Sequence, residues 1–222
     1  MHRWRQIKTW CKPKHPPFHT SFLFLLCLIV FETDSNVYLK IPLEKNEMWY
    51  NYFGTAVSHF SSSHLLSNLS GIVLFGTLLE IVHGTVASVY IYWISAVSGV
   101  LAEAQWNHSQ NVVYTGASPG VYGFVGAYLS HILLNWAEAP LRFLWIFFLC
   151  IQAIEIALLY LYDEEYRKIT AHLSHLAGFL QGILVGLITL RNIRVLRWEI
   201  WMQNIATLMS ATLIIVPTMM LQ

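Results

Sequence analysis

The stretch YTGASPGVYGFVGAY, from Tyr114 to Tyr128, places a serine within a run of small residues. Gly116 to Gly120 matches the G-x-S-x-G pattern of serine hydrolases. The glycines that recur every three residues after Ser118 are typical of a helix that packs closely against another helix. The stretch alone leaves three interpretations of Ser118 open: a nucleophile, a helix cap, or a small packing residue.

The composition around this stretch is that of a membrane protein. The 222 residues are 56% hydrophobic and 11% charged, whereas soluble domains carry about 25% charged residues. The three cysteines lie far apart, so neither a disulfide framework nor a zinc motif is indicated. Nothing in the sequence suggests nucleic-acid binding.

Apolar segments with short polar breaks fill nearly the whole chain, and no soluble domain fits between them. They predict an all-α polytopic membrane protein with spans at about 18–36, 62–82, 86–106, 118–136, 141–162, 171–190 and 199–219. The apolar core of the first span is shorter than the roughly 20 residues that a bilayer requires.

The Lys and Arg residues predict the orientation. They concentrate in the tail 1–17 and in the break around 191–198, which an even number of spans separates. The positive-inside rule makes both regions, and the N-terminus, cytoplasmic. The sequon Asn107-His-Ser109 then lies on the outer side, as a glycosylated sequon must. We expect a multi-pass protein of the secretory pathway or plasma membrane.

Polar side chains that a bilayer disfavours gather in three of the spans. The second begins with His64 and Asn68, the fourth with Ser118, and the sixth with His172 and His175. Each of these even-numbered spans enters from the outer face, so topology alone places the polar residues at one depth, where they indicate a functional site.

Glycines then predict which of these helices touch. Gly120, Gly123 and Gly126 line the fourth span, and Gly178, Gly182 and Gly186 line the sixth. If the two spans pack along these faces, Ser118 and His175 approach each other as a nucleophile and its general base. His64 and Asn68 share one helical face and can donate hydrogen bonds to a developing oxyanion.

Three motifs in this order on alternate helices resemble the rhomboid intramembrane serine proteases. They are HLLSN (His64 to Asn68), GASPG (Gly116 to Gly120) and HLAG (His175 to Gly178). The resemblance covers about residues 49–190. It implies a rhomboid-like six-transmembrane core, 18–190, which follows the short tail 1–17 and precedes a cytoplasmic loop and one C-terminal transmembrane helix, 191–222.

The resemblance also implies roles for individual residues. Ser118 would be the nucleophile and His175 the base, while His64, Asn68 and the Ser118 N–H would form the oxyanion hole. Tyr122 would pack beside the catalytic imidazole. Gly116 and Gly178 belong to the same motifs. The substrates would be transmembrane segments of single-pass proteins within the lipid bilayer, and no metal or cofactor is implied.

One departure from the family's pattern leaves an alternative open. Pro119 follows the serine where the family usually has Gly or Ala, and residues before proline avoid the helical region. A rhomboid-fold pseudoprotease that binds membrane clients without cutting them is therefore the main alternative. A third class, a transporter that uses the histidines as a proton relay, predicts activity that tolerates the loss of Ser118.

Other polar residues receive simpler interpretations. The soluble-hydrolase interpretation of G-x-S-x-G requires a strand before the serine, and the segment before Ser118 is expected to be a short loop instead. We expect His83 and His131 at the cytoplasmic interface, Glu80 in structural hydrogen bonds, and Glu103 near water at the outer end of its span. Glu155, in the middle of its span, has no assigned role.

Overall fold

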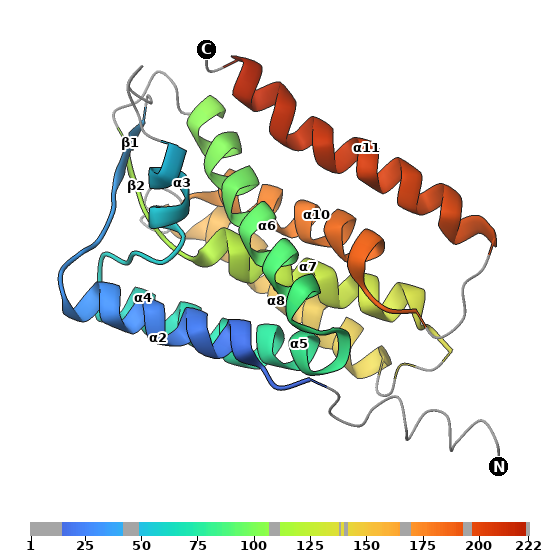
Figure 1. Ribbon diagram of the computed structural model, residues 1–222. Helices are drawn as coiled ribbons and strands as arrows, with labels where there is room; N and C mark the ends of the chain where they lie inside the picture. Colours follow the sequence, from blue (N-terminus) through green and yellow to red (C-terminus); the bar gives the residue numbers. More distant parts are fainter. Residues whose placement is uncertain are drawn as a thin grey trace.

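The computed structural model describes residues 15–41, 49–106, 112–137, 139, 142–164, 170–192 and 197–220. Most of the basic tail and the sequon at Asn107 lie outside these ranges. For Glu155 only the backbone is described. The regular structure in the described ranges is helical apart from one pair of short strands (Figure 1).

Each predicted span coincides with a helix. They are α2 (Phe18–Glu32), the continuous α4, η1 and α5 (Ser62–Gly71, Ile72–Gly76 and Thr77–His83), α6 (Thr85–Trp106), α7 (Ser118–Leu134), α8 (Arg142–Tyr162), α10 (His172–Thr189) and α11 (Arg197–Met220). Five of the seven are long and apolar enough to cross a membrane, and the others, α2 with 15 residues and α7 with 17, are shorter. The prediction of an all-α polytopic membrane fold is confirmed.

One end of the bundle carries two short strands and a short helix. Strand β1 (Leu39–Ile41) pairs antiparallel with β2 (Val112–Tyr114), and the short helix α3 (Trp49–Thr55) packs against β1 and α6. The expectation of a plain loop before Ser118 was wrong, because β2 lies there. This pair is the whole sheet within the described ranges, so the multi-stranded sheet of a soluble hydrolase is not formed there.

Close packing of α7 on α10 forms the centre of the molecule, and glycines explain the close approach. A Cβ on Gly126 would collide with the carbonyl oxygen of Phe179, and one on Gly182 with that of Gly123. The prediction that all three α7 glycines face α10 was wrong, because a Cβ on Gly120 would lie 2.5 Å from the Tyr92 ring of α6 and one on Gly123 would collide with the Ser95 side chain of α6. The seam with α10 therefore runs along Gly126, the Gly123 backbone and the α10 glycines.

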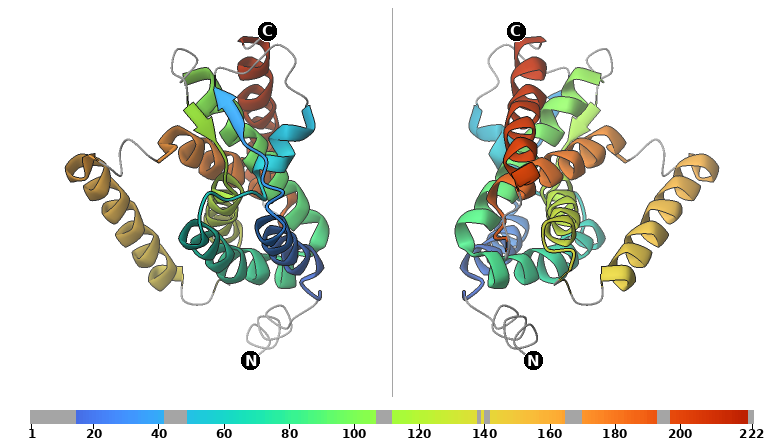
Figure 2. Two further views of the ribbon diagram at one scale, coloured as in Figure 1. Left: turned by 90° about the vertical axis from the view of Figure 1, so that its left-hand side faces the viewer. Right: turned by 90° about the vertical axis from the view of Figure 1, so that its right-hand side faces the viewer.

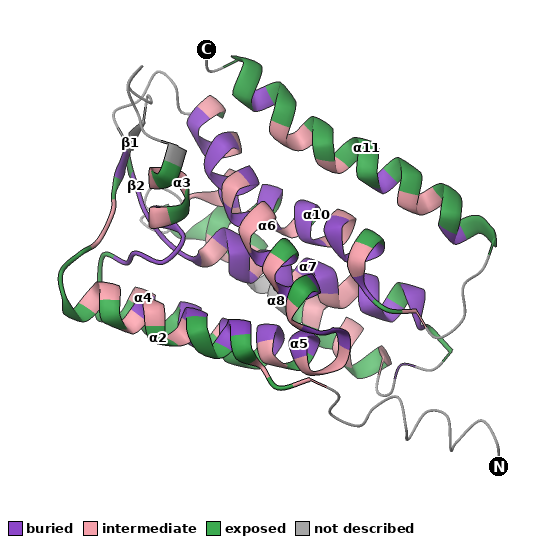
Figure 3. Cartoon of the chain, in the orientation of Figure 1, coloured by how far each residue is buried: buried purple, intermediate pink, exposed green. Residues whose placement is uncertain are grey.

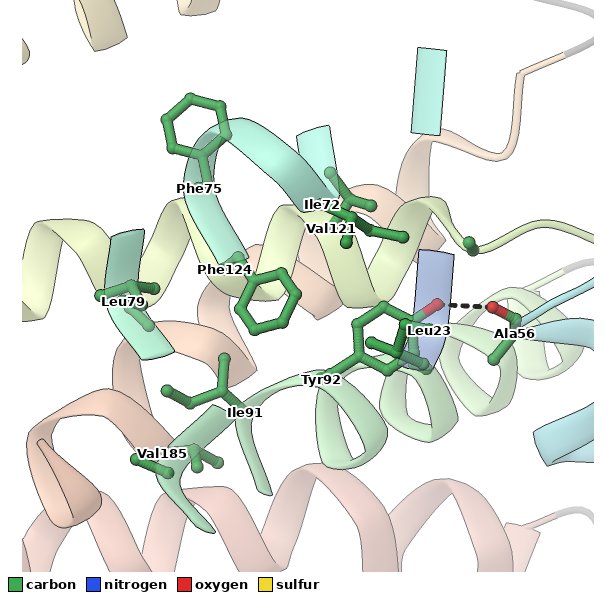
Figure 4. Packing of buried hydrophobic residues seen from close by; sticks show 14 of the residues in the cluster. Leu23, Ala56, Ile72, Phe75, Leu79, Ile91, Tyr92, Val121, Phe124 and Val185 are labelled. Atoms are coloured by element: carbon green, nitrogen blue, oxygen red, sulfur yellow. Dashed lines mark hydrogen bonds between the residues drawn. The ribbon is translucent and has the colours of Figure 1, made fainter. Parts of the chain in front are cut away.

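The apolar core lies between α2, η1, α6 and α7. Phe124, Ile91 and Leu23 are fully buried there, and the Tyr92 hydroxyl donates to the Ala56 carbonyl oxygen at 2.6 Å (Figure 4). Burial is concentrated in α6, α7 and α10 (Figure 3). These three helices form the most buried part of the bundle, and the polar clusters lie at the end that carries the strands.

The opposite end of the bundle is held by polar contacts between spans. The Glu80 carboxylate accepts the N–H groups of His19 and Thr20 at 2.8 Å each, which confirms its structural role and caps α2. The sequence predicts His83 and His131 at the cytoplasmic interface, and both lie at this end, inside the bundle. Both are buried, and Nε2 of His83 lies 2.9 Å from Nδ1 of His131.

Two helices lie at the periphery. Helix α8 stands away from the rest of the bundle in both side views (Figure 2), and α11 packs on α10 and α6. The apolar residues on the outer faces of both helices are mostly exposed, including Phe147, Leu158 and Leu208 (Figure 3). In a multi-pass protein such faces contact lipid.

Candidate active site

Ser118 is the first residue of α7 and is not its cap. The N-cap position is Ala117, which makes no side-chain hydrogen bond, and Pro119 lies in the first turn. Proline is well tolerated there because the N–H it lacks would have no partner within the helix. Ser118 is helical although a proline follows it. Because Ala117 holds the N-cap position, the Ser118 side chain can bond to another residue.

That partner is His175 of α10. Nε2 of His175 lies 2.7 Å from Oγ of Ser118. The Tyr122 ring, one turn after Ser118, stacks on the imidazole with 4.4 Å between ring centroids and 18° between planes. The seam between α7 and α10 thus brings together a hydroxyl and an imidazole that are 57 residues apart in sequence.

His64 and Asn68 project from the first turns of α4 into the same cavity. Helix α4 is capped locally, because the Ser61 side chain accepts the His64 N–H at 3.3 Å. Asn68 is 5% exposed, and its Nδ2 has no hydrogen-bond partner in the described part of the chain. A buried amide donor without a partner is costly, which is consistent with a group kept for a ligand.

Gly116 allows the loop before Ser118 to approach His64. Its φ of +141° is strained for any residue with a side chain. A Cβ at this position would also lie 2.9 Å from Cε1 of His64 and 3.6 Å from Oγ of Ser118. Glycine is therefore required by both the backbone conformation and the available space.

Pro119 fits between two glycines of neighbouring helices. A Cβ on Gly99 of α6 would lie 2.5 Å from Cβ of Pro119, and one on Gly178 of α10 would collide with the Pro119 carbonyl oxygen. The bundle thus accommodates the proline ring without displacing the start of α7. A side chain at Gly99 would collide with the Pro119 ring, and one at Gly178 would collide with the Pro119 backbone.

The four polar residues line one cavity of about 1280 Å³. Its walls come from α4, α6, α7 and α10, at the end of the bundle that holds Ser118, and from α8, which contributes Phe148, Ile156 and Tyr160. Tyr160 meets His172 edge-on, with 4.9 Å between ring centroids. Helix α8 stands apart from the bundle (Figure 2), and the cavity lies between the polar cluster and the apolar side chains that α8 contributes.

The site has the parts that nucleophilic acyl transfer needs. A serine hydroxyl lies within hydrogen-bond distance of a ring nitrogen, the ring is oriented by stacking, and amide and imidazole donors line the same cavity. The described residues include no group of His, Cys, Asp or Glu side chains that could hold a metal ion.

Sequence reasoning missed two residues that support this cluster. The hydroxyls of Tyr114 and Ser174 lie 2.7 Å apart, and the Ser174 N–H donates to Oε2 of Glu103 at 3.0 Å. Glu103 is 6% exposed and lines the cavity, so the expectation that it lies near water stays a prediction. An acidic residue within an apolar span was the available signal, but its partner lies on a different helix.

Comparisons with known proteins give one consistent result. The family model described as the Rhomboid domain matches residues 46–192. Rhomboid-related protein 1 of Caenorhabditis elegans is 30% identical over 72% of this chain and 45% of its own length. RHOMBOID-like protein 1 of Arabidopsis thaliana is 30% identical over 68% of this chain and 37% of its own. The chain therefore spans less than half the length of these two relatives.

A third relative is covered over more of its own length. The Rhomboid protease GlpG of Haemophilus influenzae is 29% identical over 52% of this chain and 62% of its own length.

Proposed function

This chain belongs to the rhomboid family, and we propose that it is an intramembrane serine protease in which Ser118 is the nucleophile and His175 the general base. The observation that carries the proposal is the 2.7 Å separation of Oγ of Ser118 and Nε2 of His175. The hydroxyl donates to the neutral imidazole, which takes its proton as Oγ attacks a peptide carbonyl carbon.

The remaining polar groups would serve the tetrahedral intermediate. The oxyanion is stabilised by Nδ2 of Asn68, by the His64 ring and by the Ser118 N–H, in the positions that the family motif assigns to them. Nδ2 of Asn68 supports this role, since it has no partner among the described residues. His175 then returns the proton to the leaving amine, and water hydrolyses the acyl-enzyme.

The proposed substrates are transmembrane segments of single-pass membrane proteins. The cavity supports this choice, because apolar side chains of α8 face polar ones across it. An unfolded stretch of a substrate helix can place its backbone at Ser118 while its apolar side chains remain among apolar partners. Substrates would enter from the lipid bilayer, and no metal or cofactor is required.

We also propose that the site faces away from the cytoplasm. The Arg191 N–H donates to Nδ1 of His83 at 2.9 Å, which places this basic segment at the end of the bundle opposite Ser118. The positive-inside rule then makes that end and the N-terminus cytoplasmic. On this basis 1–17 is a cytoplasmic tail, 18–190 the six-transmembrane core, and 191–222 a loop with the seventh span.

A cellular cleavage assay tests the activity. The full chain is expressed with a transmembrane reporter substrate, alongside Ser118→Ala and His175→Ala. We expect cleavage by the unchanged protein and a loss of at least ~1000-fold in each variant, since both residues act as one unit. Cleavage that persists in both variants contradicts the proposed dyad.

The pseudoprotease alternative rests on Pro119 and is tested by Pro119→Ala. Because the ring packs against Gly99 and the Pro119 backbone against Gly178, with Ser118 still in the first turn of α7, we expect activity within ~3-fold of the unchanged protein, as is usual when an interaction of the transition state is left intact. An inactive natural chain that gains cleavage activity from this substitution favours the pseudoprotease.

A further inference from the structure

Helix α10 carries His175 in its first turn, yet it has no cap of its own. His175 is the fourth residue of the helix, and the N-cap residue Ala171 makes no side-chain hydrogen bond. The first N–H groups of any helix lack partners within the helix, and uncapped ends fray. A general base in this position needs support from elsewhere, because small displacements of a reacting group lower the rate strongly.

That support comes from α6. Oε2 of Glu103 accepts the Ser174 N–H at 3.0 Å, and Ser174 directly precedes His175. A carboxylate at a helix N-terminus also interacts favourably with the helix dipole. Glu103 is 6% exposed and lines the cavity that contains Ser118 and His175.

The surrounding residues are arranged for this contact. Gly99 lies one turn before Glu103 on α6, and a Cβ there would lie 2.8 Å from the Ser174 carbonyl oxygen. The Ser174 hydroxyl meets the Tyr114 hydroxyl at 2.7 Å. Burial raises the pKa of Tyr114, so its phenol stays a neutral hydroxyl. Tyr114 belongs to β2, which leads into Ser118, so both halves of the dyad are linked through Ser174.

We propose that Glu103 is a positioning residue that caps α10 from the neighbouring helix and thereby holds His175 against Ser118. The inference rests on the proposed protease activity for its kinetic consequence. The role belongs to the carboxylate as a hydrogen-bond acceptor.

Two substitutions separate the acceptor from the charge. Glu103→Gln keeps an oxygen that can accept the Ser174 N–H, whereas Glu103→Leu has a similar volume and no acceptor. Gln105→Leu is the matched control, since Gln105 is two residues along α6 and its side chain donates to Sδ of Met220 in α11.

The experiment measures reporter hydrolysis by the purified full chain in lipid nanodiscs. We expect Glu103→Leu to lower kcat by ~10-fold or more at unchanged KM, because the substrate still binds while the base is displaced. Glu103→Gln and Gln105→Leu should retain kcat within ~3-fold. A wild-type kcat in Glu103→Leu overturns the inference, as does an equal loss of kcat in Glu103→Gln.

Hydrogen–deuterium exchange of the segment 172–176 gives a readout that does not depend on activity. Exchange should be faster in Glu103→Leu and unchanged in Glu103→Gln and Gln105→Leu. If the unchanged protein hydrolyses no reporter, the protease proposal fails, but this exchange pattern still tests the capping of α10. Equal exchange in all four proteins overturns the capping.

Discussion

At the scale of single residues, the site depends as much on its glycines as on its reactive side chains. Gly116 lets the loop pass beside His64, and Gly178 lets α10 approach the Pro119 carbonyl. The reactive groups are then fixed by direct contacts, with the Tyr122 ring stacked on His175. The dyad is therefore held by close backbone approaches, and adding one methyl group at such a position should disturb it.

The substitution Gly116→Ala tests this view against a matched control. Both Gly116 and Gly84 have positive φ, but a Cβ on Gly84 would lie 3.6 Å from the His15 ring at the other end of the bundle. We expect both variants to lose about 1 kcal/mol or more of stability from backbone strain. Only Gly116→Ala should also lower kcat by at least ~10-fold, because it displaces His64. Equal kcat values in the two variants contradict the account.

His59 gives a prediction about acid stability. Burial, with a smaller contribution from the charge of His64, lowers the pKa of His59 from 6.5 to about 4. The unfolded chain therefore binds a proton more readily than the folded one between these values, so the stabilisation is complete above about pH 6.5 and is lost as the pH falls towards 4.

His59→Gln removes this titration. In detergent micelles, the midpoint of thermal unfolding should fall less between pH 7 and pH 5 in His59→Gln than in the unchanged protein. An identical fall in both proteins shows that His59 does not contribute.

At the scale of elements, the seam between α7 and α10 determines the position of the base. A Cβ on Gly182 would collide with the carbonyl oxygen of Gly123. We expect Gly182→Ala to push the helices apart, with a loss of about 1–3 kcal/mol of stability and a lower kcat. Leu180→Ala, on the same helix but 42% exposed, should leave kcat unchanged. Thermal unfolding and reporter hydrolysis measure both effects.

Much of this arrangement could be predicted from the sequence. Ser118, His175, His64 and Asn68 begin alternate spans, so membrane topology alone placed them at one level. The glycine spacing predicted that α7 packs on α10. The first signal comes from the order of the spans and the second from the spacing of residues along one helix. A single sequence carries both kinds of information.

The contacts between distant elements could not be predicted in this way. The strands β1 and β2 have three residues each, too few for an alternating pattern. Gly120, Gly123 and Gly126 share one spacing, yet a Cβ on Gly120 or Gly123 would meet α6 and one on Gly126 would meet α10, because a helix with small residues on two sides can pack on two neighbours. The contact of Glu103 with Ser174 joins helices whose relative rotation the sequence does not specify.

At the scale of the whole molecule, the bundle combines a closely packed centre with a separate wall. Helices α6, α7 and α10 bury most of their surface, while α8 stands apart and closes one side of the cavity (Figures 2 and 3). At the end opposite the dyad, His83, His131 and Arg191 connect three elements by hydrogen bonds. Hydrogen bonds between elements therefore hold one end of the bundle together, and the cavity lies at the other end.

The central claim is that His175 activates Ser118 inside this cavity. The most direct measurement is covalent labelling of the purified full chain in lipid nanodiscs with a fluorophosphonate probe, followed by mass spectrometry of the modified peptide. The account predicts label on Ser118 in the unchanged protein and none in Ser118→Ala or in His175→Ala. A properly folded chain that takes no label, or one that is still labelled on Ser118 after His175→Ala, contradicts it.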